Sequence, residues 1–408
     1  MKQLDTHVRV LVTHPGRQHS HQAALALARA EMLAGYWAGV PCLADHRGLI
    51  PASIWRRFIR YGPVPLPVEL VRWHPATPVL RRIGDALLPR ALASWADFAA
   101  CRGFDRWAAH TLLKLKGVDA VIACEISALS TFRAAHRLGI TTILDAPSIH
   151  HQEQDRLHGF SEPRALHSRV LRVKDEEIAL ADHIVTVSPL ATGTYIAAGV
   201  PRERMHSVLL GADTALFAPA RASTRNERDD LVFVFAGAMI RRKGFDLLLE
   251  AFSHVRQADP GTRLEIVGPA GDASGALSGA AHAGISVLGP MSQPELARRF
   301  HGADCLVLPS RNDSYGMVVP EALAAGLPVI VSEMVGAREL VSEGVNGWVV
   351  RVDDVGALAE RMLWCSRHRA EVRAMRQACL ASAETATWGA YQQRLQAVIR
   401  ATVAVRAA

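Results

Sequence analysis

The sequence predicts an α/β protein built from two doubly wound domains of parallel strands. Short apolar runs alternate with helical stretches along most of the 408 residues, which is typical of consecutive βαβ units. This alternation stops at a polar linker, residues 211–230, and restarts at Leu231. Half of the residues are hydrophobic, enough to fill two large cores. We therefore expect one domain at residues 1–210 and a second at residues 211–387, followed by a last helix at 388–408.

The N-terminal half begins with a predicted strand at 8–12, a histidine-rich turn and a helix at 22–35. Residues 41–116 are the hardest to interpret, with a short amphipathic helix expected at 51–60 and a longer one at 90–116. Regular alternation then resumes. Strands are expected at 118–124, 141–145, 182–188 and 208–210, and helices at 127–138, 170–180 and 189–199.

In the second half, the stretch 304–350 is expected to form strand, loop, helix, strand, helix and strand. Its loop carries Asp313, and Glu321 lies one turn into the helix that Gly316 opens. Both carboxylates would lie at the carboxyl end of a parallel strand, where open α/β sheets bind ligands. The other elements expected here are strands at 231–236, 263–267 and 285–289, helices at 245–255 and 293–301, further helices between 354 and 383, and a last helix at 388–402.

This predicted crevice suits a nucleotide-sugar. The first amides of a helix attract anions, and carboxylates accept hydrogen bonds from hydroxyls. A basic cluster, Arg241, Arg242 and Lys243, follows the first strand of the same half and is well placed for a pyrophosphate. Such a cluster is more often a solvated surface when it stands alone. Its pairing with the Asp313 loop favours phosphate binding.

Charge is unevenly distributed along the chain. The net charge of +7 falls entirely in residues 1–210, which carry 25 basic and 18 acidic residues. Residues 47–107 hold 10 arginines against 4 acidic residues, together with four of the eight tryptophans. Such a surface would attract an anionic membrane face or a phosphate-bearing acceptor, although an ordinary basic surface over buried tryptophans is the alternative.

Other features of the sequence favour a cytoplasmic location. No apolar run approaches the roughly 18–20 residues of a membrane span, and the N-terminus has no signal-peptide pattern. The six cysteines are scattered and form no CxxC, as expected of reduced thiols. We expect a cytoplasmic protein that contacts the membrane at most peripherally.

Several motifs are absent from the sequence, and their absence argues against common classes of α/β enzyme. The chain has no GxGxxG, no GxxxxGK[ST] and no GxSxG, which argues against a dehydrogenase, a P-loop enzyme and an α/β-hydrolase. It also has no DxD, so cationic side chains and helix amides are left to bind a diphosphate without a metal. His14, His19 and His21 fit no metal-ligand spacing. His150 and His151 follow the strand at 141–145 and are candidate site residues.

Two segments carry a family resemblance, at residues 309–350 (PSRNDSYGMVVPEALAAGLPVIVSEMVGARELVSEGVNGWVV) and 236–252 (AGAMIRRKGFDLLLEAF). They resemble the donor-site signature of the retaining glycosyltransferases of family 4, as residues 185–217 do more loosely. The resemblance implies a GT-B architecture, in which two Rossmann-like domains face each other across a cleft. The N-terminal domain would bind the acceptor and the C-terminal domain the nucleotide-sugar, with the last helix crossing back onto the N-terminal domain.

The resemblance also implies roles for individual residues. Glu321 would contact the ribose hydroxyls, and Asp313 stands where the family has a glutamate that contacts the transferred sugar. Lys243 matches the family's diphosphate lysine, whereas the usual arginine position is Ala238, so that Arg242 or Arg241 would take its place. Asp313, His150 and Lys243 are thus the expected catalytic residues. Further donor contacts are expected from Gly268, Tyr315, Gly316, Met317 and Val318, and acceptor-side contacts from Gly16, Arg17 and His19.

The function implied is a metal-independent, retaining transfer of a hexose-type sugar from a UDP- or GDP-sugar to a glycan or lipid-linked glycan. No cofactor and no nucleic acid partner are expected. A nucleotide-sugar epimerase of the same architecture is the alternative enzyme. A non-catalytic nucleotide-sugar-binding protein is the other alternative, which the departures at Ala238 and Asp313 permit.

Overall fold

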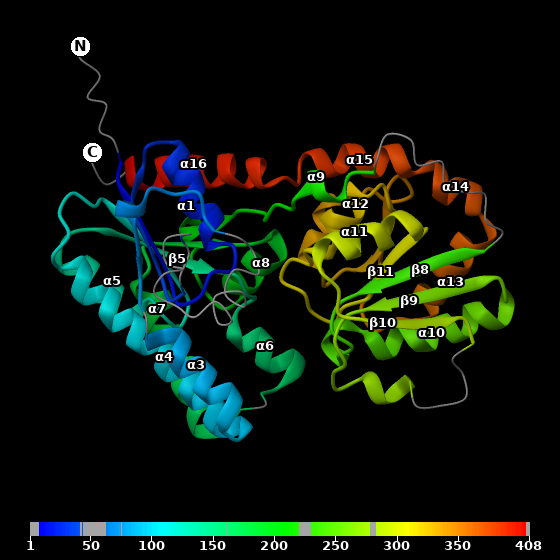
Figure 1. Ribbon diagram of the computed structural model, residues 1–408, viewed down its shortest axis with the longest axis horizontal. Helices are drawn as coiled ribbons and strands as arrows, with labels where there is room; N and C mark the ends of the chain where they lie inside the picture. Colours follow the sequence, from blue (N-terminus) through cyan, green and yellow to red (C-terminus); the bar gives the residue numbers. More distant parts are fainter. Residues whose placement is uncertain are drawn as a thin grey trace, which may run out of the picture. The chain divides into compact units, whose positions relative to one another are not determined.

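The structure, a computed structural model, describes residues 8–40, 43, 63–74, 76–160, 162–219, 230–277 and 283–404. The chain divides into two compact units, drawn in Figure 1. Unit 1 comprises residues 1–186, 192–208 and 392–408, and unit 2 comprises residues 187–191 and 209–391. The amphipathic helix expected at 51–60 lies outside the described residues.

The described part of unit 1 contains a parallel sheet of seven strands in the order β3-β2-β1-β4-β5-β6-β7. The chain runs outward from β1 to β3 and then returns past β1 to β4, so the switch point of this sheet lies between β1 and β4. The strands are β1 (Val10–His14), β2 (Leu33–Ala38), β3 (Val71–Trp73), β4 (Ala120–Cys124), β5 (Thr141–Ala146), β6 (His183–Thr186) and β7 (Met205–Ser207).

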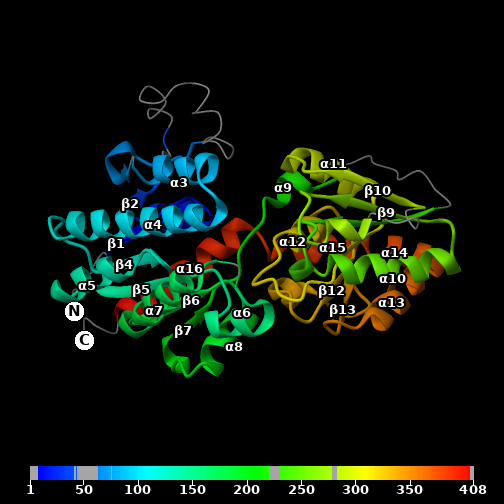
Figure 2. The same cartoon turned by 90° about the horizontal axis from the view of Figure 1, so that it is seen from below.

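Helices cover both faces of this sheet. Figure 1 shows α1 and α16 on one face and α4, α5 and α7 on the other, and Figure 2 shows α3 beside α4. The end of α16 is fixed to α1, since the Gln396 side chain donates to the Ala26 carbonyl at 2.6 Å. The helices are α1 (Ser20–Arg29), α3 (Ala76–Leu87), α4 (Arg90–Leu112), α5 (Leu129–Arg137), α6 (His151–His158), α7 (Arg164–Leu180), α8 (Pro189–Ala197) and α16 (Trp388–Ala404), with short 3-10 turns η2 (Val68–Leu70) and η3 (Arg202–Arg204).

The core of unit 1 lies between the sheet and the helices that follow its strands. Trp37 of β2, Phe104 of α4 and Phe132 of α5 are at most 2% exposed and belong to one apolar cluster. Burial of such large side chains contributes about 1.5–3 kcal/mol each to stability. The strands themselves are buried on both faces, which explains their almost continuous apolar sequences.

Unit 2 repeats this architecture. Its described residues form a parallel sheet of six strands in the order β10-β9-β8-β11-β12-β13, with the switch point between β8 and β11. Asp304 stabilises the switch point, because its carboxylate accepts from the Val232 amide at 2.9 Å and from Arg373 at 3.1 Å. The strands are β8 (Leu231–Ala236), β9 (Thr262–Val267), β10 (Ile285–Gly289), β11 (Cys305–Leu308), β12 (Val329–Ser332) and β13 (Gly347–Val350).

The helices of unit 2 begin and end at recognisable signals. Ser292 and Glu295 form a capping box at the start of α11, and Gly326, with φ +75°, follows the end of α12. In Figure 1, α10 and α13 lie on one face of the sheet and α9, α11 and α12 on the other. The helices are α9 (Thr214–Phe217), α10 (Phe245–Ala258), α11 (Gln293–Gly302), α12 (Val318–Ala324), α13 (Val355–Arg367), α14 (Arg369–Ala374) and α15 (Arg376–Glu384), with 3-10 turns η4 (Arg241–Lys243), η5 (Ser274–Leu277) and η6 (Gly336–Leu340).

The predicted fold class, two doubly wound α/β sheets, is confirmed, but some elements differ. The helix predicted at 22–35 is wrong beyond Arg29, since Glu31 has a positive φ of 57° and residues 33–38 form β2. The strand predicted at 208–210 lies at 205–207, and the helix predicted between β12 and β13 is only the turn η6. No helix among the described residues combines the length and the hydropathy needed to cross a membrane.

Candidate functional site

The candidate site in unit 2 lies at the switch point of the sheet. The loop after β8 carries Lys243, and the loop after β11 carries Asp313. Because β8 and β11 are parallel neighbours, both loops leave the same carboxyl edge of the sheet. This edge, at a switch point, is where open α/β sheets bind ligands. The topology thus brings together two residues that lie 70 positions apart in the sequence.

Lys243 and Asp313 form an ion pair. The Lys243 ammonium donates to Oδ2 of Asp313, and the two side chains are 17% and 13% exposed. Gly316 lies beside this pair, since a Cβ at Gly316 would be 3.4 Å from the same carboxylate oxygen. A cation and an anion held side by side can bind a substrate that carries both a phosphate, which the ammonium would contact, and hydroxyl groups, which would donate to the carboxylate.

Glu321 lies eight residues further on and is buried in α12. Burial raises the pKa of Glu321 to about 8, and a 3.3 Å hydrogen bond from the Gln293 side chain opposes this shift only partly. A glutamate with a pKa this far above its usual value is a candidate for ligand binding rather than a surface charge. Gln293, which begins α11, is a site residue that the sequence pattern does not single out.

Two glycines fix the shape of the loops around Lys243. Gly244 has a φ of +66°, and a Cβ there would be 2.0 Å from the carbonyl oxygen of Pro309, at the end of β11. Gly268 has a φ of +144°, and its Cβ would be 1.9 Å from the carbonyl oxygen of Gly237. Both positions therefore require glycine because two backbone segments approach closely. Gly268, predicted to bind donor, packs against the loop after β8 in this way.

Arg311 connects the two loops, and no motif in the sequence indicates this role. Its guanidinium bonds both carboxylate oxygens of Asp246, at 2.7 and 3.0 Å, and the Arg241 carbonyl at 2.7 Å. Its backbone amide donates to the Arg242 carbonyl at 2.9 Å. In return, the Arg242 guanidinium donates to the Asn312 carbonyl at 2.9 Å. These bonds fix the distance between the Lys243 loop and the Asp313 loop.

The remaining predicted donor residues differ in their exposure and in their hydrogen bonds. The Arg241 side chain is 73% exposed, and its backbone amide donates to Asp272 at 2.9 Å. Tyr315 is buried, and its hydroxyl donates to the Leu210 carbonyl, so its ring is committed to the fold. Met317 and Val318 are half-buried at the start of α12.

In unit 1, three predicted acceptor-side residues follow β1 at the switch point of that sheet. His19 pairs with Asp145, at the end of β5, with 3.1 Å between Nε2 and Oδ1. The Gly16 amide donates to Nδ1 of His14 at 2.8 Å, and Arg17 lies between Gly16 and the start of α1. Burial lowers the pKa of His14 to about 4, so this ring is neutral at pH 7. Asp145 is not among the predicted residues, although its place at a strand end is a usable signal.

His150 follows β5 and forms the N-cap of α6. Its Nδ1 accepts from the Gln152 amide at 3.3 Å, and its ring lies 4.1 Å from that of His151 and 5.0 Å from that of Tyr195. Burial, helped by the neighbouring His151, lowers the pKa of His150 to about 4. Since Nδ1 is an acceptor, the neutral ring carries its proton on Nε2 and presents a hydrogen-bond donor.

Comparisons with known proteins find similarity to glycosyltransferases. Residues 230–368 match the family model described as glycosyl transferases group 1. D-inositol 3-phosphate glycosyltransferase 1 of Catenulispora acidiphila is 29% identical over 353 residues, which are 82% of this chain and 81% of the relative. D-inositol 3-phosphate glycosyltransferase of Streptosporangium roseum is 32% identical over 255 residues, which are 57% of this chain and 58% of the relative.

Solved structures share the fold at low sequence identity. Sucrose-phosphate synthase from Thermosynechococcus elongatus superposes with a TM-score of 0.71 and 18% identity, covering 98% of this chain and 100% of that one. Anabaena HepE in complex with UDP superposes with a TM-score of 0.68 and 17% identity, covering 97% and 100%. The chain is therefore a glycosyltransferase of the GT-B fold that carries a glycosyl transferases group 1 domain.

Proposed function

We propose that the protein transfers a hexose-type sugar, with retention and without a metal, from a UDP- or GDP-sugar bound in unit 2. The observation that carries this proposal is the Lys243–Asp313 pair at the switch point, eight residues before the buried Glu321. Anabaena HepE, a structural neighbour, has been solved with UDP and with UDP-glucose, which supports a uridine nucleotide as the first choice. We also propose that the enzyme belongs to glycosyltransferase family 4, because residues 236–252 and 309–350 resemble the donor-site signature of that family.

The chemistry requires charge stabilisation on the departing diphosphate. Lys243, which is 17% exposed, and Arg242, which is more exposed and bonded to the Asn312 carbonyl, would supply it. Asp313 would lie near the oxocarbenium-like centre of the sugar, and Glu321 would accept hydrogen bonds from the ribose hydroxyls. In a retaining transfer of this kind, the leaving phosphate takes the acceptor's proton on the same face of the sugar. His150 would then donate a hydrogen bond through Nε2 rather than take a proton.

The acceptor would bind unit 1, where Gly16, Arg17, His19 and His150 lie at the carboxyl edge of the sheet. A glycan or lipid-linked glycan remains the proposed acceptor. Because the relatives are D-inositol 3-phosphate glycosyltransferases, inositol 3-phosphate belongs in the first acceptor panel. The basic excess of residues 1–210 would favour an acceptor that carries phosphate.

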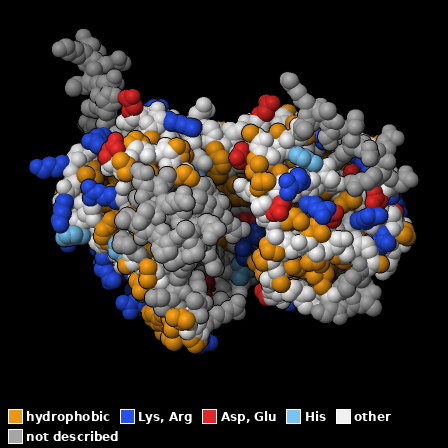
Figure 3. Space-filling view, viewed as in Figure 1, with side chains coloured by type: hydrophobic (Ala, Val, Ile, Leu, Met, Phe, Trp, Pro, Cys, Tyr) orange, Lys and Arg blue, Asp and Glu red, His pale blue; other side chains and the backbone are white. Residues whose placement is uncertain are grey.

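Peripheral contact with an anionic membrane is part of the proposal. Apolar side chains gather over the corner between α3 and α4, at the lower end of unit 1 in Figure 3. Five apolar side chains of α3, of the turn after it and of the start of α4 are 38–76% exposed: Val79, Leu80, Leu87, Leu88 and Leu92. Leucines at such a corner can enter the headgroup region of a bilayer. Cosedimentation with phosphatidylserine vesicles at low salt should therefore fall for Leu87→Ser/Leu92→Ser, whereas equal binding of wild type and variant would contradict this contact.

A thermal-shift panel of UDP, GDP, ADP and TDP tests the donor assignment. Stabilisation by UDP or GDP, abolished in Glu321→Ala, is the expected result. Product analysis then separates the two enzyme classes, because a glycoside indicates transfer and a free epimerised nucleotide-sugar indicates epimerisation. Stabilisation by ADP alone would contradict the donor class. Nucleotide binding without any turnover would favour the binding protein.

A further inference from the structure

The loop that joins β4 to α5, residues 125–128, contains a strained residue. Ile126 has a φ of +70°, in the left-handed region, which is a rare conformation for a β-branched side chain. The loop leaves β4 at the carboxyl edge of unit 1, beside the switch point. Strain of this kind persists only where the surrounding structure holds it, and it gathers at functional sites.

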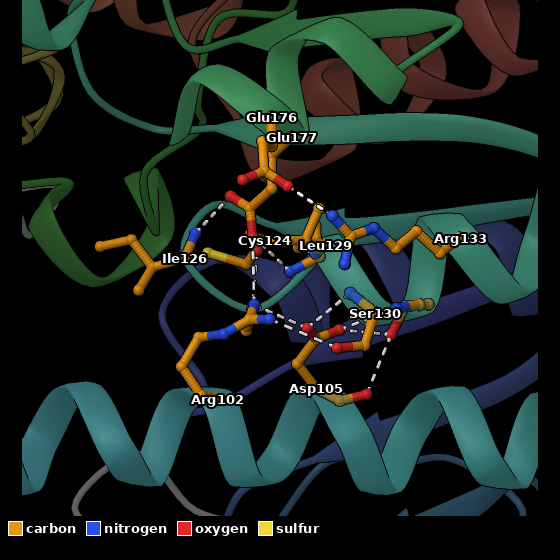
Figure 4. Close-up of polar contacts among 12 residues, drawn as sticks. Arg102, Asp105, Cys124, Ile126, Leu129, Ser130, Arg133, Glu176 and Glu177 are labelled. Atoms are coloured by element: carbon orange, nitrogen blue, oxygen red, sulfur yellow. Dashed lines mark hydrogen bonds and ion pairs between the residues drawn. The ribbon is translucent and has the colours of Figure 1, made fainter. Parts of the chain in front are cut away.

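Glu177 of α7 holds this loop in place. Its side chain is fully buried, and Oε2 accepts from the Ile126 amide at 2.7 Å. Its other oxygen, Oε1, accepts from the amides of Ala128 at 2.8 Å and Leu129 at 3.0 Å. Figure 4 shows the Glu177 carboxylate directed toward the loop from the side opposite α4. One buried carboxylate thus fixes three amides, the first of which belongs to the strained residue.

A second carboxylate supports the start of α5 but not the strained residue. Asp105 of α4 accepts from the amides of Ser130 at 2.7 Å and Thr131 at 2.9 Å. Arg102 lies between the two carboxylates, 2.7 Å from Asp105 and 3.8 Å from Glu177. Asp105 thus satisfies amides that every helix start leaves unpaired, which is a structural role. The hydrogen bond from the Ile126 amide to Glu177 is different, because Ile126 lies before the helix and its amide is not one of those that a helix start leaves unpaired.

The same turn of α7 also fixes the polar side chains around the loop. Lys174 pairs with Glu125 at 3.2 Å, and these side chains are only 10% and 11% exposed. Asp175 pairs with His151 at 2.9 Å, at the start of α6. Residues 174–177 therefore fix the loops after β4 and β5 together, at the sheet edge where unit 1 carries its candidate acceptor residues.

We propose that Glu177 is a positioning residue of the acceptor side. By holding Ile126 in its left-handed conformation, it fixes Glu125, whose carboxylate binds a hydroxyl group of a sugar or polyol acceptor while Lys174 supports it. This inference rests on the proposed transfer function. It adds a hydroxyl-binding residue, Glu125, and the buried device that places it.

Steady-state kinetics with varied acceptor test the device. In Glu177→Ala the loop can relax, so we expect the acceptor KM to rise about tenfold or more, while nucleotide binding to unit 2 stays at the wild-type value. Glu125→Gln, which keeps the shape of the side chain but removes its charge, should also raise the acceptor KM. It should lower the melting temperature less than Glu177→Ala does. If Glu177→Ala does not fold, Glu177→Gln takes its place, and we expect an intermediate rise in KM.

Asp105→Ala is the matched control. It removes the other carboxylate on the same amide row, so it should lower the melting temperature and leave the acceptor KM within about twofold of wild type. Ile126→Gly provides the rescue, because glycine adopts a positive φ without strain. In the Ile126→Gly background, Glu177→Ala should lose less stability and raise the acceptor KM less than it does alone.

The inference is overturned if Glu177→Ala behaves like Asp105→Ala, with lower stability and an unchanged acceptor KM. It is also overturned if Ile126→Gly gives no rescue. Failure of the proposed function is a separate result, since the wild-type protein would then bind nucleotide and form no glycoside. In that case the melting temperatures of the Ile126→Gly and Glu177→Ala cycle still test whether Glu177 holds the strained residue.

Discussion

At the scale of single residues, the clearest feature is a glutamate buried where a charge is costly. Glu321 lies in the core of α12, and burial raises its pKa to about 8. In the unfolded chain its pKa is close to 4.5. The folded protein thus holds this side chain neutral at pH values where the unfolded chain ionises it. The residue proposed to bind ribose therefore reduces stability near neutral pH, as is often found at ligand sites.

The sign of this effect gives the first prediction. A folded pKa above the unfolded value means that the contribution of Glu321 is fully present below pH 4.5 and is lost as the pH rises toward 8. The free energy of unfolding should fall by on the order of 3 kcal/mol between pH 5 and pH 8 through this group alone. Glu321→Gln removes that titration. In urea denaturation, the free energy of unfolding of the variant relative to that of the wild type should therefore be higher at pH 8 than at pH 5. An equal change of both proteins between the two pH values would contradict the raised pKa of Glu321.

Gly244 supplies the second prediction. Alanine there would adopt a strained φ of +66°, and its Cβ would overlap the Pro309 carbonyl oxygen at 2.0 Å. Gly244→Ala should lower the free energy of unfolding by about 2–4 kcal/mol. Gly275→Ala is the control, since a Cβ at Gly275 meets nothing within 4 Å. Equal stability of the two variants in urea would show that the loop after β8 accommodates a Cβ, against the present account.

At the scale of elements, the loops after β8 and β11 act as one piece because Arg311 joins them. Its guanidinium contacts Asp246, Asp353 and the Arg241 carbonyl, and these side chains are partly exposed. Partly exposed ion pairs contribute little to stability. The main consequence of this network is geometric, since it sets how closely Lys243 approaches Asp313.

Arg311→Ala should accordingly reduce activity more than stability. We expect the free energy of unfolding to change by about 1 kcal/mol and the kcat/KM of transfer to fall by about tenfold or more. Arg299→Ala is the control, because Arg299 of α11 pairs with Glu265 of β9 at 3.3 Å and neither residue belongs to the two loops. A loss of activity no larger than that of the control would mean that the two loops do not need this tie.

Element types were predictable where the local pattern determined them. The strands at 231–236 and 285–289 were predicted with the bounds observed, since each is a short apolar run between turn residues. The prediction failed at residues 33–38 (LAGYWA), because a strand buried on both faces has no polar–apolar alternation and its sequence resembles that of a buried helix. The short strand β3 and helices α3 and α6 depend on tertiary packing, and the pattern does not reveal them.

At the scale of the whole molecule, both units have a parallel sheet with a switch point, and the candidate residues gather at those two places. That Lys243 and Asp313 belong to one site was predicted from the sequence, because both follow strands of the same parallel half, whereas the sheet order and the ion pair between them come from the structure. The contacts of Arg311, Gln293 and Glu177 could not be predicted. They join segments that are 28 to 65 positions apart through side chains, and no spacing rule links them.

The proposed reaction depends on Lys243 as the cation nearest the departing diphosphate. The most direct test is glycoside formation from labelled UDP- or GDP-sugar by wild type, Lys243→Ala and Lys114→Ala, the last removing an exposed lysine of unit 1. We expect Lys114→Ala to keep wild-type turnover. Lys243→Ala should lose about 10²-fold or more in kcat, as expected for the loss of a charge that stabilises the transition state. Full turnover by Lys243→Ala, with the nucleotide still bound, would show that Lys243 does not stabilise the departing diphosphate.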